Sequence, residues 1–440
     1  MSASRDKISV RTPGMADEVA PSSWTLYRNT ERLGFLTVLF LITTSHYFNE
    51  DLIAVVLEPI KHEFNASDTQ LGLLTGLCFA VVYALAGFPI ARWADRGNRR
   101  IVISLAVAGW NLMTALCGLA QSFGQLALAR FGVGAMEPGG IPPAQSLVSD
   151  YFPPERRATA TAILIYGGNG AGWLVALGLG GAVAETHGWR AALLIAGIPG
   201  LLVAALASVV LREPRYQLGF PNAQGRSESV RLTLHRLWHK RSFLLLISGL
   251  AVFSIFILGV TFFVPSFLIR SFHATLQQRS EIWGSSIAIS NILGAVSGGW
   301  AADRLSRDIR WYARFPAISC LVAAPLYALA FHASSFWRFI GFQFCADCTV
   351  SAGVPVILVA VSAVSGKTRR VLATALLLSA AMLIGGALGP LFSGALSDAF
   401  HATRGTESLR HSLTAMCAFL IPAAALLYYA SRAMLQDRED

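Results

Sequence analysis

Long apolar stretches alternate with short polar ones along most of the chain. The stretches 101–120, 158–184 and 371–397 contain no charged residue. A helix rises about 1.5 Å per residue, so each of them can cross the hydrocarbon layer of a membrane, which is about 30 Å thick. The pattern predicts an all-α polytopic membrane protein with twelve transmembrane helices, near 33–57, 70–92, 100–120, 124–149, 157–185, 189–211, 242–269, 279–302, 311–332, 336–364, 370–398 and 410–433.

Composition and charge agree with a membrane protein. Of the 440 residues 54% are hydrophobic and only 14% are charged, which is too few charges to cover the surface of a water-soluble protein of this length. The net charge of +10 does not indicate nucleic-acid binding, because the basic residues lie in every second loop between apolar stretches. Basic loops stay on the cytoplasmic side of a membrane, so we expect both termini to be cytoplasmic.

A short charged sequence occurs twice, about 200 residues apart. Asp95 and Asp303 each stand in an Ala-Asp-Arg tripeptide that follows a predicted second helix, and further arginines follow at Arg99, Arg100 and Arg307. Such a repeat is typical of transporters built from two similar halves. We therefore expect a cytoplasmic tail, a six-helix bundle, a cytoplasmic linker, a second six-helix bundle and a short cytoplasmic tail, at 1–32, 33–211, 212–241, 242–433 and 434–440.

Ionisable residues inside a membrane are costly and are usually functional. Arg130 and Glu137 lie two turns apart on one face of the predicted fourth helix, and Glu50 lies at a similar depth on the first. An ion pair of Arg130 with Glu50 or with Asp51 is therefore reasonable. In a functional interpretation Glu137 or Glu50 carries a proton and Arg130 binds an anionic group. The alternative is a static buried pair that stabilises helix packing.

Other polar residues are candidates for a central cavity. Asp347 is a mid-membrane carboxylate of the second half, and acts either in coupling or as a polar spot bonded to a serine or the backbone. Tyr166, Asn169 and Trp173 share one face of the fifth helix and line a cavity, or else face the eighth helix or lipid. Tyr83 is a further lining candidate.

The repeated charged sequence around Asp95 and Asp303, which we call the hinge, predicts a gate. Asp95 can cap a neighbouring helix, or pair with Arg99 or with a basic residue at the end of the fourth helix, holding the cytoplasmic side shut. Asp303 repeats this arrangement. The arginines assigned to the same gate, or alternatively to simple membrane anchoring, are Arg96, Arg99, Arg100, Arg304 and Arg307. The sequence has no catalytic set, no phosphate-binding loop and no metal-ligand spacing, so we expect neither an enzyme nor a bound cofactor.

Several motifs resemble those of the major facilitator superfamily. They are the hinge at 95–100 and the fourth-helix stretch 126–134, which contains Arg130. More narrowly, the chain resembles the Spinster-type members found in bacteria. The matching stretches are 57–61, 67–74, 94–100, 130–137, 149–157 and 188–190, with 389–390, Gly394 and 397–398 in the second half.

The resemblance implies two bundles that rock around a central cavity, often driven by protons, with lysophospholipids or sphingoid lipids among the substrates. The chain departs from the family pattern in the first helix. Family members usually have an Asp-Arg pair there, whereas this chain has Asn49 and Glu50, followed by Asp51. This difference leaves coupling and substrate charge open.

We expect a monomeric secondary transporter of the bacterial inner membrane that moves an amphiphilic or anionic, lysolipid-like substrate with protons as coupling ion. Its partners would be that substrate and membrane lipids, with no nucleic acid. The alternatives are a transporter or facilitator of a small organic or aromatic acid, and a transporter-like binding protein that does not cycle.

Overall fold

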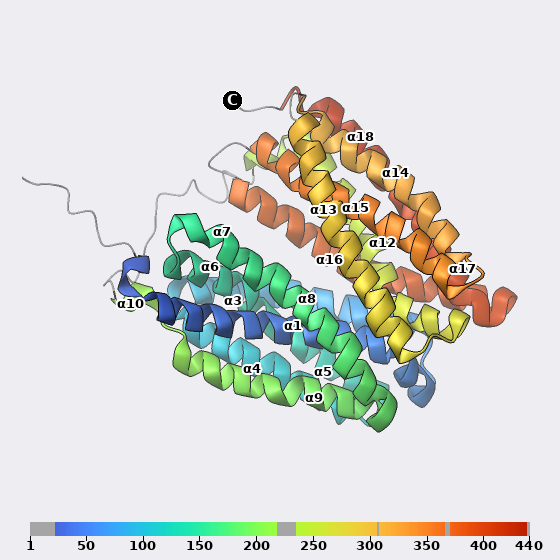
Figure 1. The fold of residues 1–440 in the computed structure, drawn as a ribbon, viewed down its shortest axis with the longest axis horizontal. Helices are drawn as coiled ribbons and strands as arrows, with labels where there is room; N and C mark the ends of the chain where they lie inside the picture. The colour runs from blue at the N-terminus through green and yellow to red at the C-terminus, as the bar shows by residue number, and fades with distance from the viewer. Residues whose placement is uncertain (1–22, 218–234, 306–307, 366–369, 438–440) are drawn as a thin grey trace, which may run out of the picture.

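The computed structural model describes residues 23–217, 235–305, 308–365 and 370–437, and all regular secondary structure in them is helical. Two groups of helices lie side by side (Figure 1). The first group contains α1 (Asn29–Phe64), α2 (Asp68–Gly72), α3 (Cys78–Arg96), α4 (Arg99–Gly118), α5 (Phe123–Met136), α6 (Ile141–Tyr151), α7 (Pro154–Ala162), α8 (Gly168–Val175) and α9 (Gly181–Val210). The second contains α12 (Arg241–Phe272), α13 (Gly284–Leu305), α14 (Trp311–Phe331), α15 (Phe336–Ser365), α16 (Arg370–Arg404), α17 (Ser408–Met416) and α18 (Leu420–Ala433).

Seven helical stretches of the described residues are long and apolar enough to cross a membrane. Two of them, 155–210 and 376–433, are more than fifty residues long. The first is interrupted at Gly188 and the second at Gly405, whose φ angles of 83° and 54° end a helix in the left-handed region that glycine tolerates. Each of these long stretches therefore turns back on itself.

The first helix and the fourth predicted span differ from a simple apolar rod. α1 begins at Asn29, inside the segment 1–32 that the sequence assigns to the tail, and runs for 36 residues. The fourth predicted span is two helices, α5 and α6, separated by a tight turn at Glu137–Gly139. Pro138 in this turn cannot donate the backbone hydrogen bond that a continuous helix needs.

The two groups repeat each other's local structure. α1 ends at Asn65 and α12 ends at His273, and both residues have a positive φ, of 49° and 48°. The following helix starts in each case with a reciprocal cap, formed by Ser67 with Gln70 and by Thr275 with Gln278. These pairs are separated by the same number of residues as Asp95 and Asp303. The repeat seen in the hinge therefore extends to the opposite ends of the helices.

The groups pack closely at one end only. We call the end that holds 65–67 and 273–277 the closed end, and the end that holds 96–99 the hinge end. At the closed end α2 packs on α16 so tightly that a Cβ atom on Gly72 would lie 2.2 Å from the carbonyl oxygen of Pro390. Figure 1 shows the groups meeting there, at the right, and diverging toward the hinge end, where α10 (Pro214–Gln217) lies.

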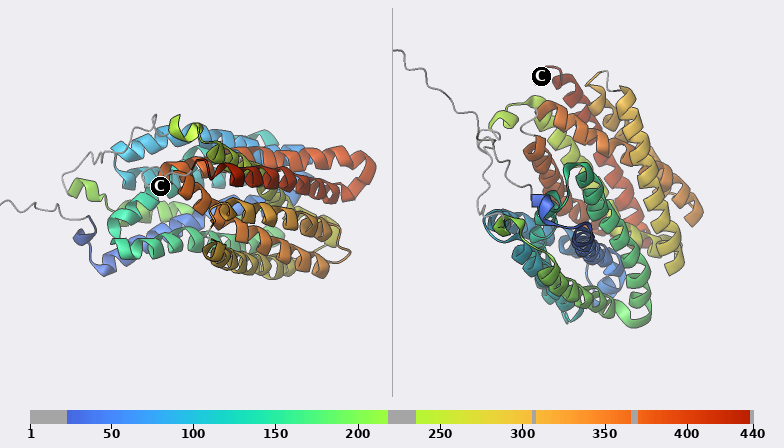
Figure 2. Two further views of the ribbon diagram at one scale, coloured as in Figure 1. Left: turned by 90° about the horizontal axis from the view of Figure 1, so that it is seen from above. Right: turned by 60° about the vertical axis from the view of Figure 1, so that its left-hand side comes forward.

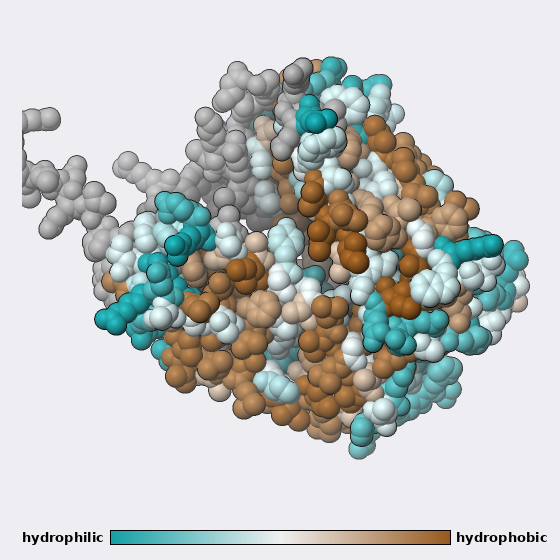
Figure 3. Space-filling view, in the orientation of Figure 1, coloured by the Kyte–Doolittle hydropathy of each residue, from teal (hydrophilic) through white to brown (hydrophobic). Residues whose placement is uncertain are grey.

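The helices of both groups run along the length of the molecule (Figure 2). Apolar side chains cover much of the face shown in Figure 3, between hydrophilic ends. Leu85, Leu128, Leu202 and Val209 are each more than 70% exposed, far more apolar surface than a water-soluble protein leaves uncovered. Lipid is the solvent that accommodates such a surface, so the chain spans a membrane.

Candidate substrate and coupling site

A cavity of about 240 Å³ lies between the two helix groups. Its walls come from α1, α3 and the π-helical stretch Leu73–Leu77 of the first group and from α12 and α16 of the second. The lining residues are Glu50, Thr75, Phe79, Ala80, Tyr83, Ala84, Gly87, Phe88, Leu258, Phe262, Ser379, Met382, Leu383 and Gly386. Glu50 is the only charged residue among the described residues of that lining, which also includes Tyr83.

A chain of three ionisable groups leads from the cavity into the first helix group. His46 Nε2 lies 3.6 Å from a carboxylate oxygen of Glu50, one turn further along α1. His46 Nδ1 lies 3.5 Å from Glu137 Oε1. In the described residues neither Glu137 oxygen nor His46 Nδ1 has a hydrogen-bond partner, although all three are buried. One imidazole therefore stands between two carboxylates and faces each with a different nitrogen.

The turn between α5 and α6 places Glu137 in this chain. Glu137 is the first residue of the turn, and its side chain is 1% exposed. Gly140, at the end of the turn, approaches Trp110 so closely that a Cβ atom there would lie 2.8 Å from the indole ring. The same indole ring lies edge-on to His46, with ring centroids 5.9 Å apart. The interruption of the helix thus brings the Glu137 backbone against α4 and its carboxylate toward α1.

Arg130 does not pair with a first-helix carboxylate, contrary to one expectation from the sequence. Its guanidinium carbon lies 5.2 Å from the centre of the Phe79 ring, and its Nε has no hydrogen-bond partner among the described residues. The side chain that faces the Glu50 carboxylate is His46 instead, with Nε2 at 3.6 Å. Arg130 is also absent from the cavity lining, whereas Phe79 belongs to it. A cation over an aromatic face is attracted by the ring's quadrupole, which explains this position.

The three polar residues at 49–51 have different surroundings. Asn49 is buried and donates from Nδ2 to Asn111 Oδ1 on α4, at 2.9 Å. Ser45 donates to the same oxygen, at 3.0 Å. Asn49 therefore links α1 to α4, while the next residue, Glu50, lines the cavity and Asp51 is half-buried outside that lining. Successive helical residues lie about 100° apart, so moving the carboxylate by one position moves it to another face.

In the second group Asp347 lies in a buried polar pair away from the cavity lining. Its Oδ1 accepts a hydrogen bond from the Tyr327 hydroxyl, and its Oδ2 has no partner in the described part of the chain. The partner is thus a tyrosine rather than a serine or a backbone group. The Tyr327 ring packs on Phe256 of α12, with centroids 4.9 Å apart. Asp347 is therefore positioned within the second group.

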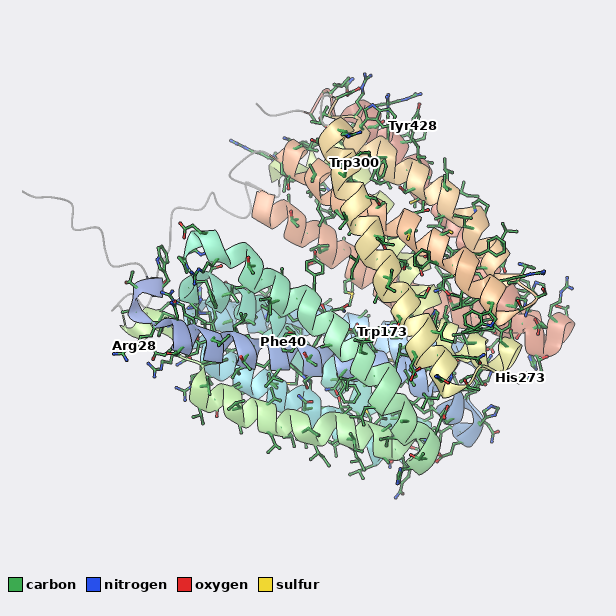
Figure 4. The ribbon with its side chains drawn as sticks, viewed as in Figure 1. Arg28, Phe40, Trp173, His273, Trp300 and Tyr428 are labelled. Carbon is green, nitrogen blue, oxygen red and sulfur yellow. The ribbon has the colours of Figure 1, made fainter. Side chains whose placement is uncertain are left out.

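The fifth-helix face is not part of the cavity lining. Tyr166 is 75% exposed and Asn169 is also exposed. Trp173 contacts Trp283, which directly precedes α13, with ring centroids 5.6 Å apart. Figure 4 labels Trp173 on α8 where this helix approaches α13. Trp173 therefore faces the eighth predicted span, 279–302, which is one of the alternatives drawn from the sequence.

The predicted contact between Asp95 and Arg99 is absent. Arg99 is buried and forms ion pairs with Asp150, at 2.6 Å, and with Glu213, at 2.5 Å. These two carboxylates occupy its guanidinium, and the Asp95 side chain is exposed. Burial alone would raise the pKa of Glu213, but hydrogen bonds and charge from Arg99 outweigh it and hold that pKa below the ordinary value. Asp150 and Glu213 are hinge residues that sequence reasoning missed.

The remaining hinge arginines make few contacts. Arg96 is exposed and Arg100 is half-buried. The Arg304 guanidinium lies over the Trp300 ring, 4.0 Å from its centre. The side chain of Asp303 and all of Arg307 lie outside the described residues.

The closed end holds a charged cluster that the sequence did not reveal. Arg270, near the end of α12, donates two hydrogen bonds to Asp68, at 2.8 and 2.9 Å, and two to Glu58, at 3.0 and 2.9 Å. Asp398 of α16 accepts from the backbone N–H groups of Asp68 and Thr69, at 3.0 and 2.8 Å. Glu58, Asp68 and Asp398 all stand in the motif stretches, but only packing shows that they meet.

A second contact between the two helix groups lies at the same end. Arg279, in the π-helical stretch Gln278–Trp283 that runs into α13, pairs with Glu185 of α9. Gly284 approaches Leu177 nearby, where an added Cβ atom would lie 2.8 Å from a leucine methyl group. The two helix groups therefore contact each other at two places at the closed end, one at Arg270 and one at Arg279. Figure 4 labels His273 beside this region.

Comparison with known proteins identifies close relatives. The family model described as Major Facilitator Superfamily matches residues 39–324. An MFS-type efflux pump of Mycolicibacterium smegmatis is 31% identical over 397 residues, covering 90% of this chain and 91% of the relative. Protein spinster homolog 3 of Mus musculus is 28% identical over 444 residues, covering 92% and 83%.

A solved structure is also similar. It is the crystal structure of a bacterial homolog to the human lysosomal transporter Spinster, in an inward-facing and unoccupied conformation. The match has 30% sequence identity and a TM-score of 0.82, and covers 94% of this chain and 100% of the other.

Proposed function

Because the chain belongs to the major facilitator superfamily and to its Spinster-type transporters, we propose that it moves an amphiphilic, lysolipid-like substrate by alternating access, coupled to protons. The observation that carries this proposal is the chain of Glu50, His46 and Glu137, which begins at the cavity between the helix groups. Substrate in the cavity would contact one end of this chain, while the other end lies in the core of the first group.

The proposal includes a membrane topology. Twelve segments cross the inner membrane of a bacterium, in bundles at 33–211 and 242–433, with the linker 212–241 and the tails 1–32 and 434–440 in the cytoplasm. The basic loops and the two stretches that turn back at Gly188 and Gly405 support it. In this topology the hinge end is cytoplasmic and the closed end faces the periplasm. The described conformation is then open to the cytoplasm, and the transporter acts as a monomer.

Proton coupling follows from the cost of buried charge. Removing an ionised carboxylate from water costs on the order of several kcal/mol unless a partner offsets it. Glu50, Asp51 and Glu137 supply three carboxylates to this region, and Arg130 supplies one permanent cation. Protons are the remaining source of positive charge. The two helix groups can move past one another at the lowest free-energy cost when protons or a charged substrate balance the charge of the carboxylates.

His46 gives the proton a route. An imidazole can accept a proton at one nitrogen and release one at the other. Nε2 faces Glu50 and Nδ1 faces Glu137, so a proton taken up from Glu50 can be passed on to Glu137 without crossing the apolar core. Small rotations of the side chains would bring both contacts to hydrogen-bond length.

Transport in proteoliposomes tests the proposal. The probe is radiolabelled lysophosphatidylcholine, extracted from the outer leaflet with albumin, with and without an imposed pH gradient. We expect the wild-type protein to translocate it and the pH gradient to drive its accumulation. Glu137→Gln mimics the protonated acid, so it should exchange substrate but lose accumulation driven by pH.

Matched variants locate the proton. Glu50→Gln tests the carboxylate at the cavity, His46→Phe removes both ring nitrogens, and Glu155→Gln is the control because Glu155 is exposed on α7. Unchanged accumulation driven by pH in all three site variants would remove Glu50, His46 and Glu137 from coupling. A wild-type protein that moves the probe without any response to the pH gradient would be a facilitator. Absence of any protein-dependent movement of the probe would contradict transport of lysolipids.

A further inference from the structure

From the cavity lining we infer that the amphiphile this transporter binds is an organic cation, held by the Glu50 carboxylate. The inference rests on the proposed transport function and specifies its substrate. None of the lining residues that the structure describes carries a positive charge, and Glu50 is the only acidic one among them. An anionic head group placed in this cavity would meet a carboxylate and no cation, whereas an ammonium or phosphonium group would meet its counter-ion.

The walls suit a bulky cation. Phe79, Tyr83 and Phe88 line the cavity from α3, and Phe262 and Met382 line it from the second group. Aromatic faces attract cations, and the attraction grows when the ion is desolvated, as it is in a narrow cavity. Methionine adds a polarizable surface that adapts to different shapes. One carboxylate in an aromatic cavity is thus a site for a delocalised or alkylated cation with apolar substituents.

The one nearby permanent cation is already engaged. The Phe79 ring, which lines the cavity, lies over the Arg130 guanidinium. The groups that interact electrostatically with Glu50 are Arg130, Asp51, Glu137, Tyr47 and Tyr83, and His46 lies beside it. One guanidinium can offset at most one of these three carboxylates, so the others stay uncharged only while they hold protons. A cationic ligand can take the place of the proton at Glu50, which is the only carboxylate among the described lining residues.

Cation and proton would then compete for the same carboxylate. When a cation binds at Glu50, the carboxylate there gives up its proton to the water of the cavity, so one proton leaves the protein for each cation that binds. When the cation is released, Glu50 takes up a proton again. The arrangement thus exchanges an organic cation for a proton.

Two ions of nearly the same shape and opposite charge test the inference. Purified protein in detergent is incubated with radiolabelled tetraphenylphosphonium at pH 7.5, and bound ligand is measured by scintillation proximity. We expect saturable binding that excess unlabelled tetraphenylphosphonium displaces and that the same concentration of tetraphenylborate does not. Lowering the pH should weaken binding.

Three variants assign the charge to Glu50. Glu50→Gln should weaken tetraphenylphosphonium binding by about tenfold or more, which corresponds to about 1.4 kcal/mol. Glu50→Asp keeps the charge and should bind within a few-fold of wild type, as should Glu155→Gln. Displacement by tetraphenylborate as good as by the cation, or wild-type affinity in Glu50→Gln, would overturn the cation site. Either result leaves lysolipid transport to be judged by the proteoliposome assay, because this assay measures binding without transport.

Discussion

Arg270 of α12 and Asp68 of α2 form a two-pronged ion pair across the interface between the helix groups, with hydrogen bonds of 2.8 and 2.9 Å. The Asp68 side chain is 2% exposed, and Lys61 and Ser397 also donate to it. A guanidinium from the second half thus shares with Lys61 the neutralisation of a buried carboxylate of the first. The pair can form only when the two halves meet at this end.

Arg270→Gln should therefore destabilise the closed end. Hydrogen bonds to charged groups contribute about 1.5–3 kcal/mol each, and loss of one such contribution raises the population of the separated state by about tenfold or more. Spin labels at His62→Cys and Gln277→Cys, in a background without the native cysteines, would report longer distances. Arg190→Gln is the control, because Arg190 pairs with Glu63 within the first group. An unchanged distance distribution would remove Arg270 from the gate.

Asp95→Asn should slow transport while leaving the described conformation intact. The Asp95 side chain is exposed here, so its charge stabilises nothing in this state and is available for another one. We expect an unchanged melting temperature and a reduced rate of lysolipid translocation. Asp150→Asn makes the comparison, because it removes an ion pair of Arg99 and should lower the melting temperature. Wild-type transport by Asp95→Asn would contradict a gating role.

Arg130→Gln distinguishes two roles of this arginine. If Arg130 balances the carboxylates, its removal strengthens the binding of tetraphenylphosphonium at Glu50, by up to about tenfold for about 1.4 kcal/mol of lost repulsion. The measurement is best made at pH 8.5, where fewer protons compete. If Arg130 instead binds an anionic group, as first expected from the sequence, the variant should lose the binding of tetraphenylborate. Weaker cation binding would contradict the balancing role.

Glu213→Gln should destabilise the hinge end in a pH-dependent way. Burial raises the pKa of Glu213, but Arg99 lowers it further than burial raises it, so the folded protein holds the ionised form. The stabilisation is present above the ordinary pKa of 4.5 and is lost as the pH falls below it. The difference in melting temperature between wild type and variant should thus be largest near neutral pH and shrink in acid. A difference that is constant with pH would assign the effect to packing.

Features that depend on neighbouring residues could be predicted from the sequence. The interruption at Glu137–Gly139 follows from Pro138, and the turn at Gly188 follows from the polar break between two apolar stretches. The separation of Glu50 from Asn49 and Asp51 follows from helical geometry alone. The family resemblance rests on short motifs of the same local kind.

Partners of charged residues could not be predicted in this way. The sequence suggested Asp95 for Arg99, and packing places Asp150 and Glu213 there instead. It suggested Glu50 or Asp51 for Arg130, which stacks on Phe79. In each case the sequence placed several carboxylates at a depth in the membrane where they could meet the arginine. The choice among them depends on helix rotation and on side chains from other helices, which a linear pattern does not contain.

The sequence by itself determined the membrane class and the duplicated halves, because apolar length and charge act through adjacent residues. Only the tertiary structure decided that His46 stands between Glu50 and Glu137, and that Arg270 meets Asp68 some two hundred residues away. Buried charges lower their free energy through whichever partners the packed helices bring within reach. That choice exists only after the helices have assembled.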